Sequence, residues 1–242
     1  MSDFRSELYS RYVSSFKMTS SRLDDSIVKR YWVWCTHKYL PLINMIDRLQ
    51  PILDLGCGPG YVMEFLQNQG FTHIEGVDIS AEQVAIAVER GLNAKIADAL
   101  TFLNAKQNTF GLIMALDFVE HFSKEELFPM FAAIYASLQP GGVLFIQTPN
   151  GRGLFPNQVI YDDLTHMTIF TPDSLQNILK ITGFHQFGFH ETGPAPSNFK
   201  GIIRVGLWWV IKCIANAVRL IETNKTQNVW TENLICICYK PQ

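Results

Sequence analysis

Short apolar runs alternate with helix-like segments along most of this chain, and this alternation constrains the fold more than any other feature. Apolar runs bounded by glycine, proline or polar residues have the length of buried strands, and the segments between them have helical spacing. Strands that alternate with helices form βαβ units, whose sheet is mostly parallel and covered on both faces. The expected strands are 52–55, 74–78, 94–97, 110–116 and 143–148, and the expected helices are 61–69, 81–90 and 125–138.

Length and composition indicate one folded domain with an appendage. The chain has 242 residues, of which 48% are hydrophobic and 17% charged, enough to bury a sizeable core. Residues 1–50 are expected to form an N-terminal helical cap, and residues 51–242 the main domain. The net charge of −2 gives no electrostatic case for nucleic acid, so no nucleic-acid partner is expected. The N-terminal residues lack the apolar run of a secretory signal, and the five cysteines lack zinc-site spacing. We therefore expect a cytoplasmic protein without a metal.

A glycine-rich turn, LGCGPGY, joins the first expected strand to the first helix of the alternating region. Its spacing is G-x-G-x-G, and Asp54 precedes it. A dinucleotide fingerprint needs a small residue where Tyr61 stands, and the Gly-Lys-Ser/Thr of a P-loop does not follow. In an open parallel sheet, ligands bind beyond the carboxyl ends of the strands. The turn is therefore expected to hold a ligand through its backbone.

Aspartates follow three of the expected strands, at Asp78, Asp98 and Asp117. A carboxylate at the first position can accept hydrogen bonds from two ribose hydroxyl groups, and one at the second can accept a hydrogen bond from an exocyclic amine. A single aspartate after a strand is often only a helix cap. Three at corresponding strand ends, together with the glycine turn, indicate a binding site.

The motifs LDLGCGPG, GVDIS, ADAL, ALDFVEHF and LQPGGVLFIQTPN stand in the order of those of class I S-adenosylmethionine-dependent methyltransferases, which residues 50–192 resemble. The resemblance implies an α/β, Rossmann-like, seven-stranded sheet that is mostly parallel with the last strand antiparallel. FGFHET and LICICYK are the expected sixth and seventh strands. It also implies S-adenosyl-L-methionine as cofactor and S-adenosyl-L-homocysteine as product.

The same resemblance implies roles for individual residues. The methionine part of the cofactor would be held by Asp54, Gly56, Cys57, Gly58 and Gly60, and its methionine side lined by Leu116, Asp117 and Phe118. The ribose and adenine would be held by Asp78, Ile79, Asp98 and the Ala99 amide. This agrees with the chemistry, because a sulfonium cation and an amino acid end need carboxylates and backbone amides rather than a phosphate cradle.

Methyl transfer is an in-line displacement, so the enzyme mainly aligns donor and acceptor and deprotonates a hydroxyl acceptor. Two histidines are candidates for the base. His166 lies in the loop YDDLTHM with Asp162 and Asp163 nearby, and His121 follows the fourth expected strand. A histidine can take a proton near neutral pH and is oriented by a neighbouring carboxylate. We expect His166, supported by Asp163, to be the base and His121 to be second; a packing role is open for either.

A narrower resemblance concerns the acceptor. The loop D-x-T-H followed by F-T-P-x-S-L, with KYLPLI upstream and RLIET and VWTENLI downstream, is similar to methyltransferases of bacterial surface polysaccharide and lipopolysaccharide synthesis. It implies O-methylation of a sugar in a glycan that can be lipid-linked. The alternatives are O-methylation of a small phenolic or quinone-type acceptor, and a cofactor-binding, non-catalytic partner in glycan assembly.

Residues 198–223 form an apolar segment between the sixth and seventh expected strands. On a helix, its four basic residues fall within an arc of roughly 120°. The basic residues break the apolar length that a membrane span needs. Three interpretations stay open: a helix packed on the domain's own core, a lid or dimer contact, and a helix on the surface of a membrane. The last would place the protein peripherally at the inner face of the membrane. The four basic residues are Lys200, Arg204, Lys212 and Arg219.

Overall fold

The structure, a computed structural model, describes residues 24–242. The first part of the expected helical cap, residues 1–23, lies outside the described residues. The described residues form a seven-stranded sheet in the order β3-β2-β1-β4-β5-β7-β6, in which β7 runs antiparallel to both of its neighbours and the other pairs are parallel. The expected fold class is therefore confirmed. The strands are β1 Ile52–Leu55, β2 Ile74–Asp78, β3 Ala94–Ile96, β4 Phe110–Leu116, β5 Leu138–Pro149, β6 His185–Glu191 and β7 Asn233–Tyr239.

The helices follow the hydrophobic pattern closely. The predicted helices 61–69, 81–90 and 125–138 each lie within one residue of the observed bounds. Capping residues account for several starts: Thr171 caps the helix that begins at Pro172, as expected of Pro at a first helical position. The helices are α3 Asp25–Lys38, α4 Leu40–Ile43, α5 Tyr61–Asn68, α6 Ala81–Glu89, α7 Ala99–Asn104, α8 Lys124–Ser137, α9 Asn157–Tyr161, α10 Pro172–Thr182, α11 Phe199–Thr223, and the 3-10 helix η1 Val119–His121.

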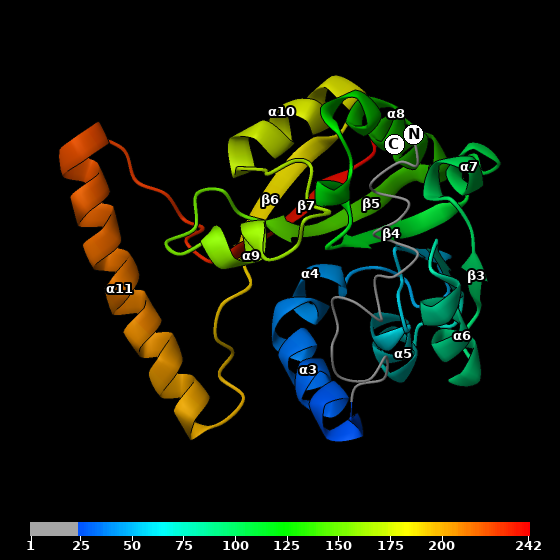
Figure 1. The fold of residues 1–242 in the computed structure, drawn as a ribbon, viewed down its shortest axis with the longest axis horizontal. Coiled ribbons are helices and arrows are strands. Elements are labelled where there is room, and N and C mark those ends of the chain that lie inside the picture. The colour runs from blue at the N-terminus through cyan, green and yellow to red at the C-terminus, as the bar shows by residue number, and fades with distance from the viewer. Residues whose placement is uncertain (1–23) are drawn as a thin grey trace.

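Successive residues of the central strands pack into two apolar cores, one on each face of the sheet. Leu53 and Ile113 join the core under α7, α8 and α10, whereas Ile52 and Leu112 join the core under α3, α4 and α5. This alternation follows from the pleat, which turns neighbouring side chains to opposite faces. Figure 1 shows the helices gathered in these two layers. The central strands are thus fixed from both sides, and their carboxyl ends form a rigid edge.

The order of the strands changes direction between β1 and β4, because the chain first builds β1 to β3 outward and then returns to β4 on the other side of β1. Open α/β sheets bind ligands at such a switch point, beyond the carboxyl ends of the strands. The glycine turn after β1 and the segment after β4 both lie at this edge, next to the ends of β2 and β5.

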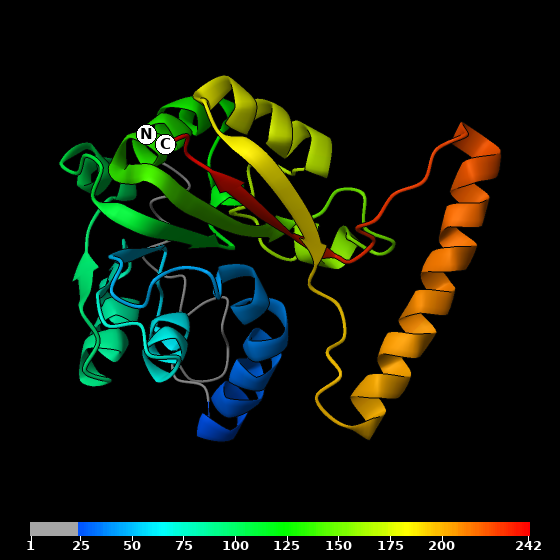
Figure 2. The ribbon, with the colours of Figure 1, turned by 180° about the vertical axis from the view of Figure 1, so that it is seen from behind.

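One helix stands apart from these layers. Figures 1 and 2 show α11 beside the domain, joined to it by the linkers after β6 and before β7. Among the residues of α11, all of which the structure describes, Gly201 is the one that is buried. The interpretation that this segment packs on the domain's own core is therefore wrong, because its apolar side chains face away from that core.

Candidate functional site

The glycine turn between β1 and α5 has a backbone that other residues rarely adopt. Gly56, Gly58 and Gly60 all have positive φ, at +68°, +51° and +78°. A Cβ at Gly60 would lie 2.2 Å from Leu92 Cδ1, so the turn packs tightly against the chain behind it. The spacing G-x-G-x-G therefore reflects steric need. The Cys57 thiol of the same turn is buried, and burial raises its pKa.

Two carboxyl groups lie next to this turn. The Gly58 amide donates a hydrogen bond to Asp78 Oδ2 at 2.9 Å, and the Ser80 amide donates to Asp78 Oδ1 at 2.8 Å. These bonds hold the Asp78 carboxylate in place at the end of β2. Asp54 is buried, and burial, with the charge of Asp78, raises its pKa to about 7. A cationic group placed beside Asp54 would favour its ionised form.

The residue after β2 has an exposed apolar side chain, and the residues after β3 form the N-terminus of α7. Ile79 is 57% exposed although it follows a buried strand. Asp98 caps α7, because its Oδ1 accepts hydrogen bonds from the Thr101 amide and hydroxyl group, both at 2.8 Å. Ala99 is the first residue of that helix, so its amide belongs to the helix N-terminus. Asp98 thus has the capping role that a single strand-end aspartate often has.

After β4 the chain turns sharply at Asp117, a non-glycine residue with φ of +48°. The Gln147 side-chain amide donates to both oxygens of Asp117 at 3.1 Å, and Gln147 Oε1 accepts a bond from the Tyr39 hydroxyl group at 2.8 Å. Phe118 covers Gly56, since a Cβ there would lie 2.9 Å from the Phe118 ring. Leu116 ends the strand. The structure therefore brings the glycine turn and the β4 end together, as expected.

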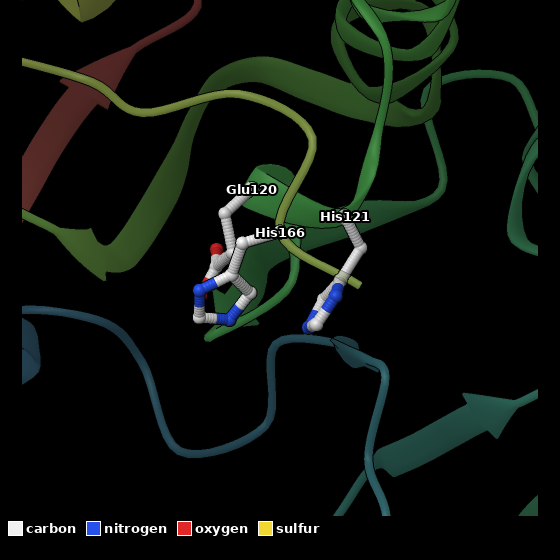
Figure 3. A group of neighbouring side chains, drawn as sticks. All are labelled: Glu120, His121 and His166. Atoms are coloured by element: carbon white, nitrogen blue, oxygen red, sulfur yellow. The ribbon is translucent and has the colours of Figure 1, made fainter. Parts of the chain in front are cut away.

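Two histidines and a glutamate form the second half of the site. The rings of His121 and His166 lie edge to face, with centroids 5.0 Å apart. Figure 3 shows the Nδ1 edge of His166 turned toward Glu120. Glu120 is fully buried, and burial, with the nearby charge of Asp117, raises its pKa well above the ordinary value. Thr148 donates a hydrogen bond to its Oε2 at 3.0 Å.

The hydrogen bonds of Thr165 fix the tautomer of His121. The Thr165 hydroxyl group lies 2.6 Å from Asp163 Oδ1 and 2.8 Å from His121 Nδ1. Because the carboxylate only accepts, the hydroxyl proton goes to Asp163, and His121 Nδ1 must be the donor to the hydroxyl oxygen. Burial, with the neighbouring His166 ring, lowers the pKa of His121 to about 4. The ring is thus neutral at physiological pH.

Backbone bonds hold the loop that carries His166 against η1. The Met167 and Thr168 amides donate to the Glu120 carbonyl group at 2.8 and 3.0 Å, and the Thr168 hydroxyl group donates to the Phe122 carbonyl group at 2.8 Å. Residues far apart in the sequence therefore share one rigid wall of the site.

Glu120, His121 and His166 also form a set of metal-ligand type. Their ligand atoms lie within 4.8 Å of one another. Glu120 Oε1 and His166 Nδ1 are buried and have no hydrogen-bond partner among the described residues. The set could hold a divalent ion. Alternatively, the raised pKa of Glu120 keeps its carboxyl group protonated, and that proton can be shared between Glu120 Oε1 and His166 Nδ1. The prediction of no metal rested on sequence spacing, which misses a set formed by two loops.

Sequence reasoning also missed four residues that support the site: Tyr39, Glu120, Gln147 and Thr165. Two of them carried a signal, since Glu120 directly follows the apolar Val119 in ALDFVEHF and Gln147 directly follows the apolar Ile146 in VLFIQTPN. A buried polar side chain needs a hydrogen-bond partner, so such a position indicates a supporting role. Tyr39 and Thr165 carried no such signal, because their partners are set by tertiary structure.

The fold and this edge define the class of protein. The structure aligns over 98% of the chain with all of a SAM-dependent methyltransferase from Archaeoglobus fulgidus, with a TM-score of 0.67 and 21% identity. It aligns over 97% of the chain with 60% of a phosphoethanolamine N-methyltransferase 2 from Haemonchus contortus, with a TM-score of 0.62 and 18% identity. The fold is that of the class I methyltransferases.

A family model described as a methyltransferase domain matches residues 28–186, and the chain belongs to this family. Among curated relatives, phosphoethanolamine N-methyltransferase 2 of Caenorhabditis elegans is 32% identical over 64% of the chain and 36% of its own length. The mitochondrial ubiquinone biosynthesis O-methyltransferase of Rattus norvegicus is 30% identical over 54% of the chain and 43% of its own length. The chain thus spans less than half the length of these relatives.

Proposed function

We propose that this protein is an S-adenosylmethionine-dependent methyltransferase that acts on a hydroxyl oxygen. S-adenosylmethionine is the cofactor, and when bound it supplies a methyl group already activated by the sulfonium centre. The residues at the β1 and β2 ends fit it. Asp78 would accept the ribose hydroxyls, exposed Ile79 would pack on adenine, and Asp54 would face the amino acid end. Gln83 Oε1, close to Gly58 and without a partner among the described residues, adds a further acceptor there.

The observation that carries the proposal is the chain of contacts from Asp163 through Thr165 to His121. It leaves a neutral imidazole at the edge beyond β4, in the segment that also carries Asp117 and Phe118. Such a group can accept the proton of a hydroxyl as the oxygen attacks, and the Asp163 carboxylate stabilises the imidazolium that results. His166, ranked first from the sequence, would position the acceptor beside it.

The acceptor that this base suits best is a phenolic or quinone-type hydroxyl. A phenol, whose pKa is about 10, is a much stronger acid than an alcohol, so its hydroxyl needs less help from a base. The loop that carries His166 also exposes the apolar side chains of Leu164 and Met167, and Phe155, just before α9, is exposed as well. Apolar contacts suit an aromatic acceptor. The similarity to a ubiquinone biosynthesis O-methyltransferase adds support.

A sugar hydroxyl, as predicted from the sequence, is the second candidate. The observation in its favour is the pair Asp162 and Asp163 in the same loop, since carboxylates bind sugar hydroxyls by charge-assisted hydrogen bonds. A cofactor-binding partner without catalysis is the third, and an amine acceptor, suggested by the phosphoethanolamine relatives, is the fourth.

The test is methyl transfer from labelled S-adenosylmethionine to a panel of acceptors: a catechol, a hydroxylated quinone with a short prenyl tail, a lipid-linked glycan, and phosphoethanolamine. We expect transfer to the catechol and the quinone. Transfer to the glycan alone would assign the sugar reaction, and transfer to phosphoethanolamine alone would contradict O-methylation. Tight cofactor binding without transfer to any acceptor would favour the non-catalytic role.

A further inference from the structure

Helix α11 turns polar side chains toward the domain and apolar side chains toward the outside, which is the reverse of an ordinary surface helix. Such helices bury an apolar stripe and expose polar residues. In α11 the partly buried side chains, which are turned toward the domain, are Trp208, Lys212, Ala215, Asn216 and Arg219. Opposite them lies a broad apolar face that covers roughly 180° of the helix. The members of this apolar face include Phe199, Ile203, Leu207, Val210, Ile214 and Ile221.

Polar contacts hold the inner stripe to the domain. Glu191, at the end of β6, accepts hydrogen bonds from Lys212 Nζ at 2.7 Å and from Trp208 Nε1 at 3.2 Å. The Gln227 amide donates to Asn216 Oδ1 at 2.9 Å, and the Gln227 side chain donates to the Arg152 carbonyl group. The orientation of the helix is thus set by its polar side, and the apolar face is left pointing outward.

The apolar face is too large to be an incidental feature of a surface. Trp209 is 64% exposed and Ile221 is 88% exposed, and the helix of 25 residues is about 37 Å long. Exposed apolar patches of this extent mark binding surfaces for protein or membrane. In the part of the chain that the structure describes, α11 is the one helix long and apolar enough to cross a membrane.

The linkers nevertheless exclude a spanning arrangement. Glu191 of β6 pairs with Leu234 of β7, so both linkers of α11 start from the same end of the sheet. A spanning helix would place its two ends on opposite sides of a hydrocarbon layer about 30 Å thick. One linker would then have to cross that layer as irregular chain with its backbone groups exposed to lipid, which does not occur. The helix can meet a membrane only by lying along it.

The charges of α11 indicate which surface it would meet. Lys200 and Arg204 are exposed at the border of the apolar face, and Glu222 in the last turn is the only acidic residue of the helix. A broad apolar face bordered by basic residues is typical of helices that lie in the interface of an anionic membrane. From this arrangement we propose that α11 docks the protein onto anionic lipid, with its apolar face in the interface.

The first experiment is flotation of the full-length protein with vesicles of phosphatidylglycerol and phosphatidylcholine, compared with phosphatidylcholine alone. We expect binding to the anionic vesicles and weaker binding to the neutral ones, with the difference reduced by salt. The variant Ile214→Glu/Ile221→Glu should weaken binding by on the order of a hundredfold, because two exposed apolar side chains that would enter the membrane interface are replaced by charged ones. Ile181→Glu, at an exposed isoleucine of α10, is the matched control and should bind as the wild type does.

The second experiment uses a native probe. The structure describes all five cysteines of the chain; Cys213 in α11 is exposed, and the other four are buried. An environment-sensitive dye on Cys213 should shift to the blue on addition of anionic vesicles and be quenched by brominated lipid chains. A stable dimer with no vesicle binding would overturn the proposal in favour of a second copy as the partner. A monomer that binds no vesicle, or a double glutamate variant that binds as well as the wild type, would overturn it outright.

Discussion

The two halves of the candidate site are built in different ways. On the cofactor side, the Gly58 amide and Asp78 are 20 residues apart and belong to neighbouring βα units. On the acceptor side, His121 and Thr165 are 44 residues apart, and Gln147 and Tyr39 are 108 apart. A site made from consecutive strand ends leaves a motif in the sequence, whereas one assembled from two loops leaves scattered residues. The difference teaches that motif order can identify a cofactor long before it identifies a reaction.

The largest effect should come from the acceptor side. His121→Ala should lower the single-turnover rate of methyl transfer by about 10² to 10⁴, the usual contribution of a positioned base, at saturating cofactor. His166→Ala should cost less, since its Nδ1 faces Glu120. Cofactor affinity, measured in parallel by calorimetry, should change little in the His166 variant. A dead His166→Ala protein with an active His121→Ala protein would restore the ranking predicted from the sequence.

On the cofactor side, Asp78→Ala should weaken binding of S-adenosylmethionine or S-adenosylhomocysteine more than a hundredfold. Losing two charge-assisted hydrogen bonds costs on the order of 3 kcal/mol. Asp173→Ala is the matched control, because this exposed aspartate pairs with Arg152 at the surface. Unchanged affinity in a folded Asp78→Ala protein would contradict the prediction that Asp78 binds the ribose hydroxyl groups. The difference drawn between the cofactor half and the acceptor half of the site would then fail as well.

A smaller effect concerns pH and Asp54. Its pKa is raised to about 7 by burial and by Asp78, so the empty protein keeps this proton up to near neutral pH, and an ammonium group beside it would displace the proton. Affinity for S-adenosylhomocysteine should therefore rise with pH by at most about tenfold per unit below pH 7 and then level off. Calorimetry near pH 6 in two buffers should show proton release. Asp54→Asn should abolish this pH dependence; if it persists, another group is responsible.

The raised pKa of Asp54 also makes the free energy of unfolding depend on pH. In the unfolded chain Asp54 loses its proton near its ordinary pKa of 3.8, whereas the folded protein holds it to about 7. The folded state binds more protons between these values, so this group's contribution to the free energy of unfolding falls as pH rises through that window.

The smallest expected effect is that of metal removal. We expect full activity after exhaustive chelation. The raised pKa of Glu120 favours its protonated form, and a proton shared between Glu120 and His166 would satisfy both groups without a metal ion. Activity that returns only with added magnesium or zinc would contradict this. That result would identify Glu120, His121 and His166 as the ligands of a metal ion.

The sequence predicted the fold well because its determinants are local. Strands β1, β2 and β4 match their predicted bounds, since each is an apolar run closed by glycine or aspartate. The last two strands were also placed correctly within two residues. The length of β5 was underestimated, because it begins before the Pro-Gly-Gly sequence that was interpreted as a turn, and Gly141 has the positive φ of a bend within the strand.

The candidate site was predictable only in part. The glycine turn, Asp78, Asp117 and Phe118 do lie together at the switch point, while their roles stay predictions. The link from Asp163 through Thr165 to His121 could not be foreseen, because it depends on how the loop before α10 docks on η1. Nor could the orientation of α11 be foreseen. Its four basic residues share one arc in the sequence, but within the described residues 24–242 Lys212 alone of the four is ion-paired with the domain.

The position of α11 also makes it separable from the rest of the protein. Strands β6 and β7 are antiparallel neighbours, so a tight Asn-Gly hairpin could join them directly. Helix α11 is therefore an insertion into the loop of the β6–β7 hairpin. Long insertions at such a site cost a domain little stability. A shortened chain with such a turn would keep the sheet and both loops of the site. Location in the cell and chemistry would then be two properties that can be exchanged independently between proteins of this fold.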